Sequence, residues 1–227
     1  MRAEEILKQL KSLADPKAVA GMARFGINPK NTYGIAVPIL RKMAKEIGKN
    51  HKLAQELWDS GIHEARILAG MIDEPTMVTE KQMEKWVKDF DSWDVCDQVC
   101  MNLFEKVPFA PKKINKWSKR QEEFVKRTAY TLIACLAWHD KEAPDKFFLG
   151  FLSLIKSGAT DERNFVRKAV NWALRNIGKR NLSLNKAAIK AAKEIQKMDS
   201  KSAKWIAADA LRELTSEAVQ KRLRAKR

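Results

Sequence analysis

The sequence contains the motif Phe124-Val125-Lys126-Arg127-Thr128-Ala129 and two later copies of it. A close copy starts 41 residues further on at Phe165, and a weaker copy starts another 40 residues on at Trp205. This period is typical of HEAT-like repeats, whose helix pairs bury their apolar faces only by stacking on neighbouring pairs. It therefore predicts an all-α protein, a HEAT-like repeat α-solenoid in which helix pairs form a curved superhelix with one concave face.

The remainder of the sequence also consists of helical patterns separated by short breaks, without the alternation that marks strands. Two helix starts carry capping signals: Asp15 precedes Pro16, and Thr79 has Gln82 as a capping-box partner. The helices expected before Pro108 cover residues 4–13, 16–24, 37–47, 51–58, 63–72, 79–88 and 92–106. No linker composition divides the chain, so we expect residues 1–227 to form a single HEAT-like repeat domain.

One of the breaks, residues 25–34, combines two glycines with aromatic and amide side chains. Such a loop could contact a nucleic-acid backbone or simply turn a corner between helices. Its composition favours the corner.

The charge balance predicts a polyanionic partner. The chain has 44 Lys and Arg against 28 Asp and Glu, a net charge of +16. Residues 1–90 contribute 15 basic and 12 acidic side chains, whereas residues 91–227 contribute 29 and 16. Nucleic acid fits this charge better than a membrane surface, because no basic amphipathic helix stands apart from the core pattern. The alternative is a solvated cationic surface, and the tail at residues 221–227 is open to that interpretation.

The sequence has no targeting segment and no disulfide framework. It lacks a run of about 18 apolar residues, and its first residues are charged, so we expect a soluble cytoplasmic protein with no membrane partner. The odd cysteine count, Cys96, Cys100 and Cys135, fits a reducing compartment. Cys96 and Cys100 have the spacing of half a metal site, but no His or second Cys pair completes it. We interpret all three as small core residues.

The first candidate site lies on the helix expected after Ser92. Trp93 and Asp97 are four residues apart, so they share one face at the edge of that helix. The apolar stripe beside them consists of Cys96, Val99, Cys100, Leu103 and Val107. Acids also suit the first turn of any helix, and Trp93 fits an ordinary core position. Spacing alone favours that ordinary interpretation.

A second candidate lies in the copy that begins at Phe165. Its apolar stripe is Val166, Ala169, Val170, Ala173 and Ile177. Trp172 falls more than about 90° from this stripe, on a basic side shared with Lys168, Arg175 and Lys179. Packing against the neighbouring repeat is the alternative for this indole. Arg127 also lies off its own stripe, where it can contact a phosphate or remain solvated or ion-paired.

These motifs resemble the AlkD family of HEAT-like-repeat alkylpurine DNA glycosylases, the DNA alkylation repair proteins. The resemblance covers most of the chain. It is carried by Ser92-Trp93-Asp94-Val95-Cys96-Asp97, by Arg127 in its motif, and by Val166-Arg167-Lys168-Ala169-Val170-Asn171-Trp172-Ala173-Leu174-Arg175. In that family two Trp, an Asp and an Arg surround the damaged nucleotide. The resemblance assigns these positions to Trp93, Trp172, Asp97 and Arg127.

The resemblance implies a monofunctional glycosylase that hydrolyses the N-glycosidic bond of N3- or N7-alkylated purines in duplex DNA. We also expect the protein to be monomeric. It implies no metal, no organic cofactor and little dependence on base flipping. Asp97, Trp93 and Trp172 would be catalytic, and Arg127, Lys168, Arg175 and Lys179 would bind DNA. Two alternatives remain: a noncatalytic protein that binds branched or damaged DNA, and a HEAT-type scaffold for another protein.

Three nearby polar residues are not assigned to catalysis. The pair His63 and Glu64 begins an expected helix, where a carboxylate with a neighbouring His is usually solvated capping. Asp94 competes with Asp97 as the acid, but it lies about 100° from Trp93 and is expected to face elsewhere.

Overall fold

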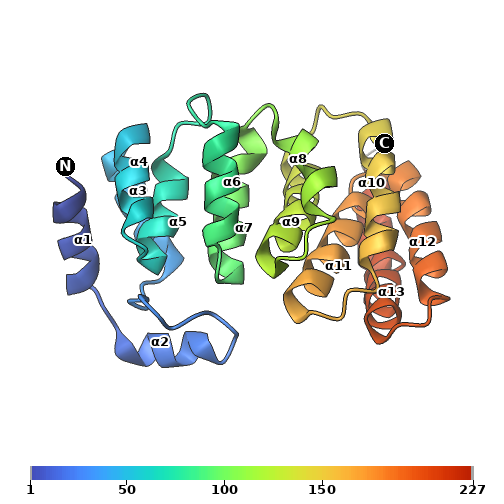
Figure 1. Cartoon of the computed structure of the whole chain (residues 1–227). Coiled ribbons are helices and arrows are strands. Elements are labelled where there is room, and N and C mark those ends of the chain that lie inside the picture. Colours follow the sequence, from blue (N-terminus) through green and yellow to red (C-terminus); the bar gives the residue numbers. More distant parts are fainter. Residues whose placement is uncertain (1, 226–227) are drawn as a thin grey trace. The chain divides into compact units, whose positions relative to one another are not determined.

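The computed structural model describes residues 2–225, and this range contains fourteen α-helices, one 3-10 turn and no strand (Figure 1). The helices are α1 (Ala3–Ser12), α2 (Pro16–Ala23), α3 (Val37–Ile47), α4 (His51–Asp59), α5 (His63–Ile72), α6 (Glu80–Asp89), α7 (Trp93–Asn102), α8 (Ala110–Trp117), α9 (Glu123–His139), α10 (Asp145–Gly158), α11 (Asn164–Gly178), α12 (Leu182–Gln196), α13 (Lys201–Leu214) and α14 (Glu217–Arg224). The all-α prediction is confirmed.

The capping signals are confirmed in part. An Asp15 carboxylate oxygen accepts hydrogen bonds from the backbone N–H groups of Lys17 (2.9 Å) and Ala18 (3.1 Å), which starts α2. Thr79 accepts the backbone N–H of Gln82 at 3.1 Å, but the Gln82 amide donates to the buried Asp73 instead of returning to Thr79. The predicted capping box is therefore wrong in its second half.

The helix expected over 92–106 is interrupted. Helix α7 ends at Asn102, and a 3-10 turn, η1 (Phe104–Lys106), follows it. Leu103 between them leaves helical geometry with φ −128° while its side chain is fully buried. The apolar pattern of the sequence continues through this bend because Leu103, Phe104 and Val107 stay buried in the core.

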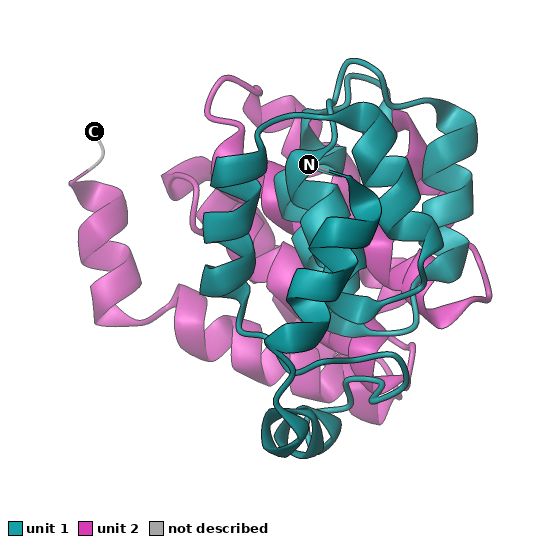
Figure 2. Ribbon diagram, turned by 90° about the vertical axis from the view of Figure 1, so that its left-hand side faces the viewer, with its two compact units in different colours: residues 1–110 teal, residues 111–227 magenta. Residues whose placement is uncertain are grey.

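The chain divides into two compact units, shown in different colours in Figure 2. Unit 1 ends at Ala110 and unit 2 begins at Pro111, so the division falls in the first turn of α8. A proline is tolerated there because the first helical N–H groups have no intrahelical acceptor. That residues 1–227 form one domain stays a prediction.

Unit 1 is centred on α5, which packs against α3, α4 and α7, whereas α2 lies crosswise to its neighbours (Figure 1). The contact between α5 and α7 is close at Gly70. A Cβ atom there would lie 3.0 Å from the Val99 side chain, so a larger residue would push the helices apart. This packing fixes where α7 presents its polar residues.

Unit 2 contains the three copies of the motif on α9, α11 and α13, and α11 packs against both of the others. Residues of successive copies are in contact, and in the first pair the two residues are equivalent. The rings of Phe124 and Phe165 stack with their centroids 5.7 Å apart, and the Arg167 guanidinium lies 5.1 Å from the centroid of Trp205. The predicted repeat is therefore a real structural repeat.

Charge is divided unequally between the units. Unit 1 has 16 basic and 16 acidic residues, whereas unit 2 has 28 basic and 12 acidic residues. The formal net charge of +16 therefore belongs entirely to unit 2. Among residues 2–225, no helix has both the length and the apolar character that a bilayer span requires.

Candidate active site

Helix α7 carries Trp93 and Asp97 one turn apart, as predicted. Ser92 occupies the N-cap position, but its hydroxyl accepts a hydrogen bond from the backbone N–H of Asn28 (2.8 Å) and does not cap the helix. The predicted apolar stripe is confirmed by the burial of Cys96, Val99, Cys100, Leu103 and Val107. The core thus fixes one face of α7 and leaves the flank with Trp93 and Asp97 at its edge.

Trp93 is not an ordinary core residue. Its side chain is intermediate between buried and exposed, and its indole Nε1 donates a hydrogen bond to the backbone carbonyl of Phe25 (3.1 Å). Phe25 itself is 74% exposed. Core indoles in the same unit differ: Trp58 and Trp86 are at most 1% exposed and stack 3.9 Å apart. Trp93 is therefore held at the edge of unit 1, and the ordinary-core interpretation is wrong.

Asp97 lies one helical turn after Trp93 and is 7% exposed. A carboxylate in such a position acts on a nearby charge with less solvent screening than a surface carboxylate does. Helix α7 thus combines a mostly buried acid with a partly exposed indole. This arrangement suits the stabilisation of a cation at the edge of the unit.

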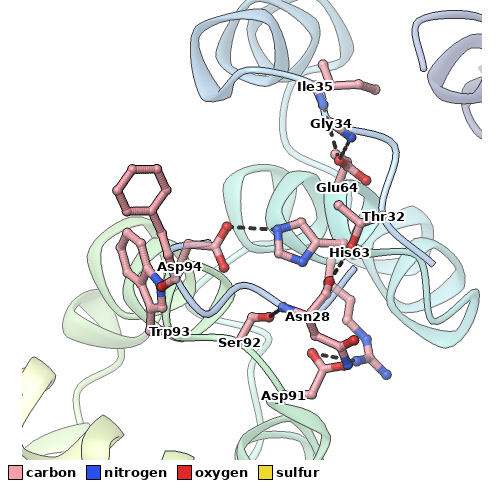
Figure 3. A network of polar contacts seen from close by, with 12 residues as sticks. Asn28, Thr32, Gly34, Ile35, His63, Glu64, Asp91, Ser92, Trp93 and Asp94 are labelled. Atoms are coloured by element: carbon pink, nitrogen blue, oxygen red, sulfur yellow. Dashed lines mark hydrogen bonds and ion pairs between the residues drawn. The ribbon is translucent and has the colours of Figure 1, made fainter. Parts of the chain in front are cut away.

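His63 and Glu64, at the start of α5, are buried at 4% and 0% exposure. Their interpretation as solvated capping residues is therefore wrong. The His63 Nε2 lies 2.8 Å from the Asp94 carboxylate, which points toward the imidazole (Figure 3). Asp94 thus faces α5, as expected from its angle to Trp93.

The environment of His63 favours its protonated form. Burial lowers the pKa of the imidazole, but the hydrogen bond to Asp94 and the charges of Asp94, Glu64 and Asp91 outweigh this effect. The pKa of His63 is therefore raised above its ordinary value. A protonated His63 forms an ion pair that joins the first turns of α5 and α7.

Glu64 holds the loop that precedes α3 (Figure 3). Its carboxylate accepts the backbone N–H groups of Tyr33 (2.9 Å), Gly34 (2.7 Å) and Ile35 (3.2 Å). Gly34 is required there, because its φ is +82° and an added Cβ atom would lie 2.5 Å from the carbonyl oxygen of Asp15. The carboxylate thus supplies hydrogen-bond acceptors for backbone N–H groups that have no partner in a helix or a sheet.

The other end of this loop is attached to the start of α7. The Asn28 backbone N–H donates to the Ser92 hydroxyl, and the Asn28 side-chain amide donates to Asp91 over 2.7 Å (Figure 3). The indole of Trp93 also donates to the carbonyl of Phe25. Three successive residues, Asp91, Ser92 and Trp93, therefore hold the loop at the start of α7. The loop turns a corner, as favoured, and it also positions the indole of Trp93.

Arg127 lies on α9 in unit 2, where it is 5% exposed. Its Nη1 donates to the backbone carbonyl of Phe165 over 2.5 Å, which links α9 to the first turn of α11. The guanidinium is therefore anchored within the repeat rather than extended into solvent. That it also contacts a phosphate stays a prediction.

The basic side of α11 is partly neutralised by α13. Arg175 contacts Glu213 (2.5 Å) and Asp209 (3.4 Å), and Lys179 contacts Glu213 (2.7 Å). Burial raises the pKa of the Glu213 carboxyl, but the hydrogen bond from Lys179 and the charges of Arg175 and Lys179 outweigh it, so the pKa is lowered. These acids were not predicted from the sequence, although Asp209 and Glu213 are one turn apart on the next copy of the motif.

On the same side of α11, Lys168 is exposed and Trp172 is intermediate between buried and exposed. Trp172 is therefore not fully buried in the core of unit 2. The candidate residues thus divide between the units, with Trp93 and Asp97 in unit 1 and Arg127, Trp172 and the three cations in unit 2. Their convergence on one concave face stays a prediction. Cys96, Cys100 and Cys135 are buried, as expected for core residues.

Comparison with known proteins supports this description. The protein named Uncharacterized protein Lin0241, from Listeria innocua serovar 6a (strain ATCC BAA-680 / CLIP 11262), is 24% identical over 199 residues, which cover 86% of this chain and 87% of the relative. A solved structure is described as a new family of proteins related to the HEAT-like repeat DNA glycosylases with affinity for branched DNA structures. It superposes with a TM-score of 0.78 at 20% identity and covers 94% of this chain and 95% of its own. This likeness confirms the predicted HEAT-like repeat fold. The family model described as DNA alkylation repair enzyme matches residues 6–214, and the chain belongs to that family.

Proposed function

We propose that the protein is a monofunctional alkylpurine DNA glycosylase that hydrolyses the N-glycosidic bond of N3- or N7-alkylated purines in duplex DNA. The observation that carries the proposal is on α7: Asp97 is 7% exposed and lies one turn from the partly exposed Trp93. Membership of the DNA alkylation repair enzyme family supports it.

The reaction needs a negative charge more than a strong acid. An N3- or N7-alkylated purine is already cationic, so the bond between its nitrogen and C1′ breaks with both electrons going to the base, which leaves neutral. The sugar develops oxocarbenium character, water adds to C1′, and a proton is released from that water. Asp97 would stabilise the positive sugar and orient the water. No metal or organic cofactor takes part in these steps.

The aromatic and basic residues would hold the DNA. Trp93 and Trp172 would contact the deoxyribose, where the electron-rich faces of the indoles favour a developing cation. Arg127, Lys168, Arg175 and Lys179 would contact phosphates, which gives affinity without sequence readout. The restriction of the net charge to unit 2 supports this division of labour between the units.

The decisive experiment measures the release of 7-methylguanine and 3-methyladenine from methylated duplex DNA. Wild-type protein should release the bases, and Asp97→Asn should reduce release by at least about a hundredfold with nearly unchanged DNA affinity. Asp59→Asn is a matched control, because Asp59 is an exposed acid at the end of α4 and its loss removes the same charge. The absence of base release by pure wild-type protein would falsify the proposal.

A second candidate is a noncatalytic protein that binds branched or damaged DNA. It is favoured by the affinity for branched DNA named for the structurally similar protein. This function predicts salt-dependent binding that is identical in the wild type and Asp97→Asn, with no base released by either. Any excision that depends on Asp97 excludes it.

A further inference from the structure

A pocket of about 370 Å³ opens in unit 2, whereas the residues proposed for base release on α7 belong to unit 1. The ends of α9 and α11, the first residues after them, and α14 form its walls. Of its eight lining residues, four are Lys or Arg, one is Trp and none is acidic. Its volume is in the lower part of the range of ligand pockets.

Trp138 supplies an aromatic surface to this pocket. It is 58% exposed and is therefore the most exposed tryptophan of the described chain. It stands in the last turn of α9, directly after a segment in which Leu136 and Ala137 are still buried. The core does not use this indole, so its face is available for stacking on a planar ligand.

Two of the four cations of the pocket, Lys179 and Arg180, make contacts within the protein. Arg180 donates to the carbonyl oxygens of Ala137 (2.9 Å) and Asp140 (2.7 Å), which satisfies the end of α9. Lys179 is paired with Glu213. These two residues are therefore part of the framework that shapes the pocket.

Lys141 and Arg222 are the two cations with exposed side chains. The Lys141 ammonium donates one of its N–H groups to the backbone carbonyl of Trp138, whose indole lines the same pocket. Arg222 lies on α14 and makes no ion pair with any described residue. An indole and two exposed cations in the lining of one pocket match a ligand that has both a flat ring and an anionic group.

We propose that this pocket binds one unpaired nucleotide of a DNA strand, with its base stacked on Trp138 and its phosphate held by Lys141 and Arg222. Bases within an intact duplex are already stacked on each other and cannot use the indole, whereas a base at an overhang or a branch can. Charge complementarity supports a polyanion, because unit 2 carries the whole net charge of +16. The proposal concerns undamaged DNA and does not depend on base release.

The test compares binding of a labelled blunt duplex with binding of the same duplex extended by a single-stranded overhang. Wild-type protein should bind the overhang form about tenfold more tightly. Trp138→Ala should remove this preference and leave the affinity for the blunt duplex unchanged, whereas Trp138→Phe should keep part of the preference. The double variant Lys141→Ala and Arg222→Ala should also lose it.

The double variant Lys146→Ala and Lys186→Ala is the matched charge control, because both lysines are exposed in the same unit and do not line the pocket. It should keep the full preference. Competition distinguishes the source of the nucleotide: single-stranded oligonucleotide should abolish the preference at lower concentration than a free mononucleotide. Equal binding of both duplexes by wild-type protein overturns the proposal, as does an intact preference in Trp138→Ala. Displacement by a polyglutamate peptide as efficient as that by oligonucleotide also overturns it, because the pocket would then select acidic protein.

Discussion

The imidazole Nε2 of His63 lies 2.8 Å from the Oδ2 atom of Asp94, and this contact joins the first turns of α5 and α7. The side chains are 3% and 13% exposed, so the pair is almost completely removed from water. Breaking such a buried pair from one side typically costs about 3 kcal/mol. The pair therefore helps to fix the helix that carries Trp93 and Asp97.

Stability should decrease as the pH rises through the raised pKa of His63. The folded protein binds this proton more tightly than the unfolded chain, so the stabilisation is complete below the unfolded pKa of about 6.5 and is lost above the folded pKa. Urea unfolding should show a larger difference between wild type and His63→Gln at about pH 5.5 than at about pH 8.5. Asp94→Asn should show the same trend. A difference that does not change with pH would contradict the ion pair.

Glu64→Gln should destabilise unit 1 by about 2 kcal/mol. In the wild type three backbone N–H groups donate to the carboxylate, whereas the amide of Gln would place its own NH₂ donor against some of them. Limited proteolysis within residues 25–35 should also become faster. Glu56→Gln is the control, since Glu56 is an exposed acid on α4. Equal denaturation midpoints for the two variants would show that the carboxylate does not hold the loop.

Gly34→Ala and Gly21→Ala should have opposite effects on thermal unfolding. At Gly34 the left-handed φ of +82° and the nearby carbonyl of Asp15 oppose a side chain, so we expect a loss of about 2 kcal/mol or more. Gly21 lies in α2, where a Cβ atom would have no neighbouring atom within 4 Å, so alanine should add about 0.5–1 kcal/mol. A neutral Gly34→Ala would mean that the loop can adopt another path.

Glu213→Gln should tighten DNA binding and lower stability at the same time. The substitution releases Arg175 and Lys179 from their shared acid, so more cations become available to phosphates. If one or two more phosphates are contacted, the slope of log affinity against log salt concentration should become steeper by about 0.9 for each of them. Glu217→Gln, an exposed acid on α14, removes the same charge without releasing a paired cation. Identical slopes for these two variants would argue against a DNA-binding role of the α11 cations.

The helices and the repeat were accessible from the sequence because they depend on local periodicity. The apolar stripe of α7 and the register of the copies at Phe124 and Phe165 agree with the structure. The bend at Leu103 was missed, since a buried residue continues the same pattern whether or not the backbone stays helical.

The polar contacts of the site were not accessible in the same way. Glu64 and Tyr33 are 31 residues apart, as are His63 and Asp94, and nothing in the spacing pairs them. A charged pair at a helix start usually faces solvent, so burial of His63 and Glu64 required knowledge of the loop that covers them. The acids that form ion pairs with Arg175 and Lys179 were not predicted for a related reason. Periodicity shows which residues share a face of a helix, but it does not show which residues of another helix contact that face.

The unequal charge of the two units also affects how the molecule meets a polyanion. An electric field acts on unit 2 with the full charge of +16 and exerts almost no net force on unit 1. The molecule therefore experiences a torque as well as an attraction. We therefore expect unit 2 to make the first contacts with a polyanion.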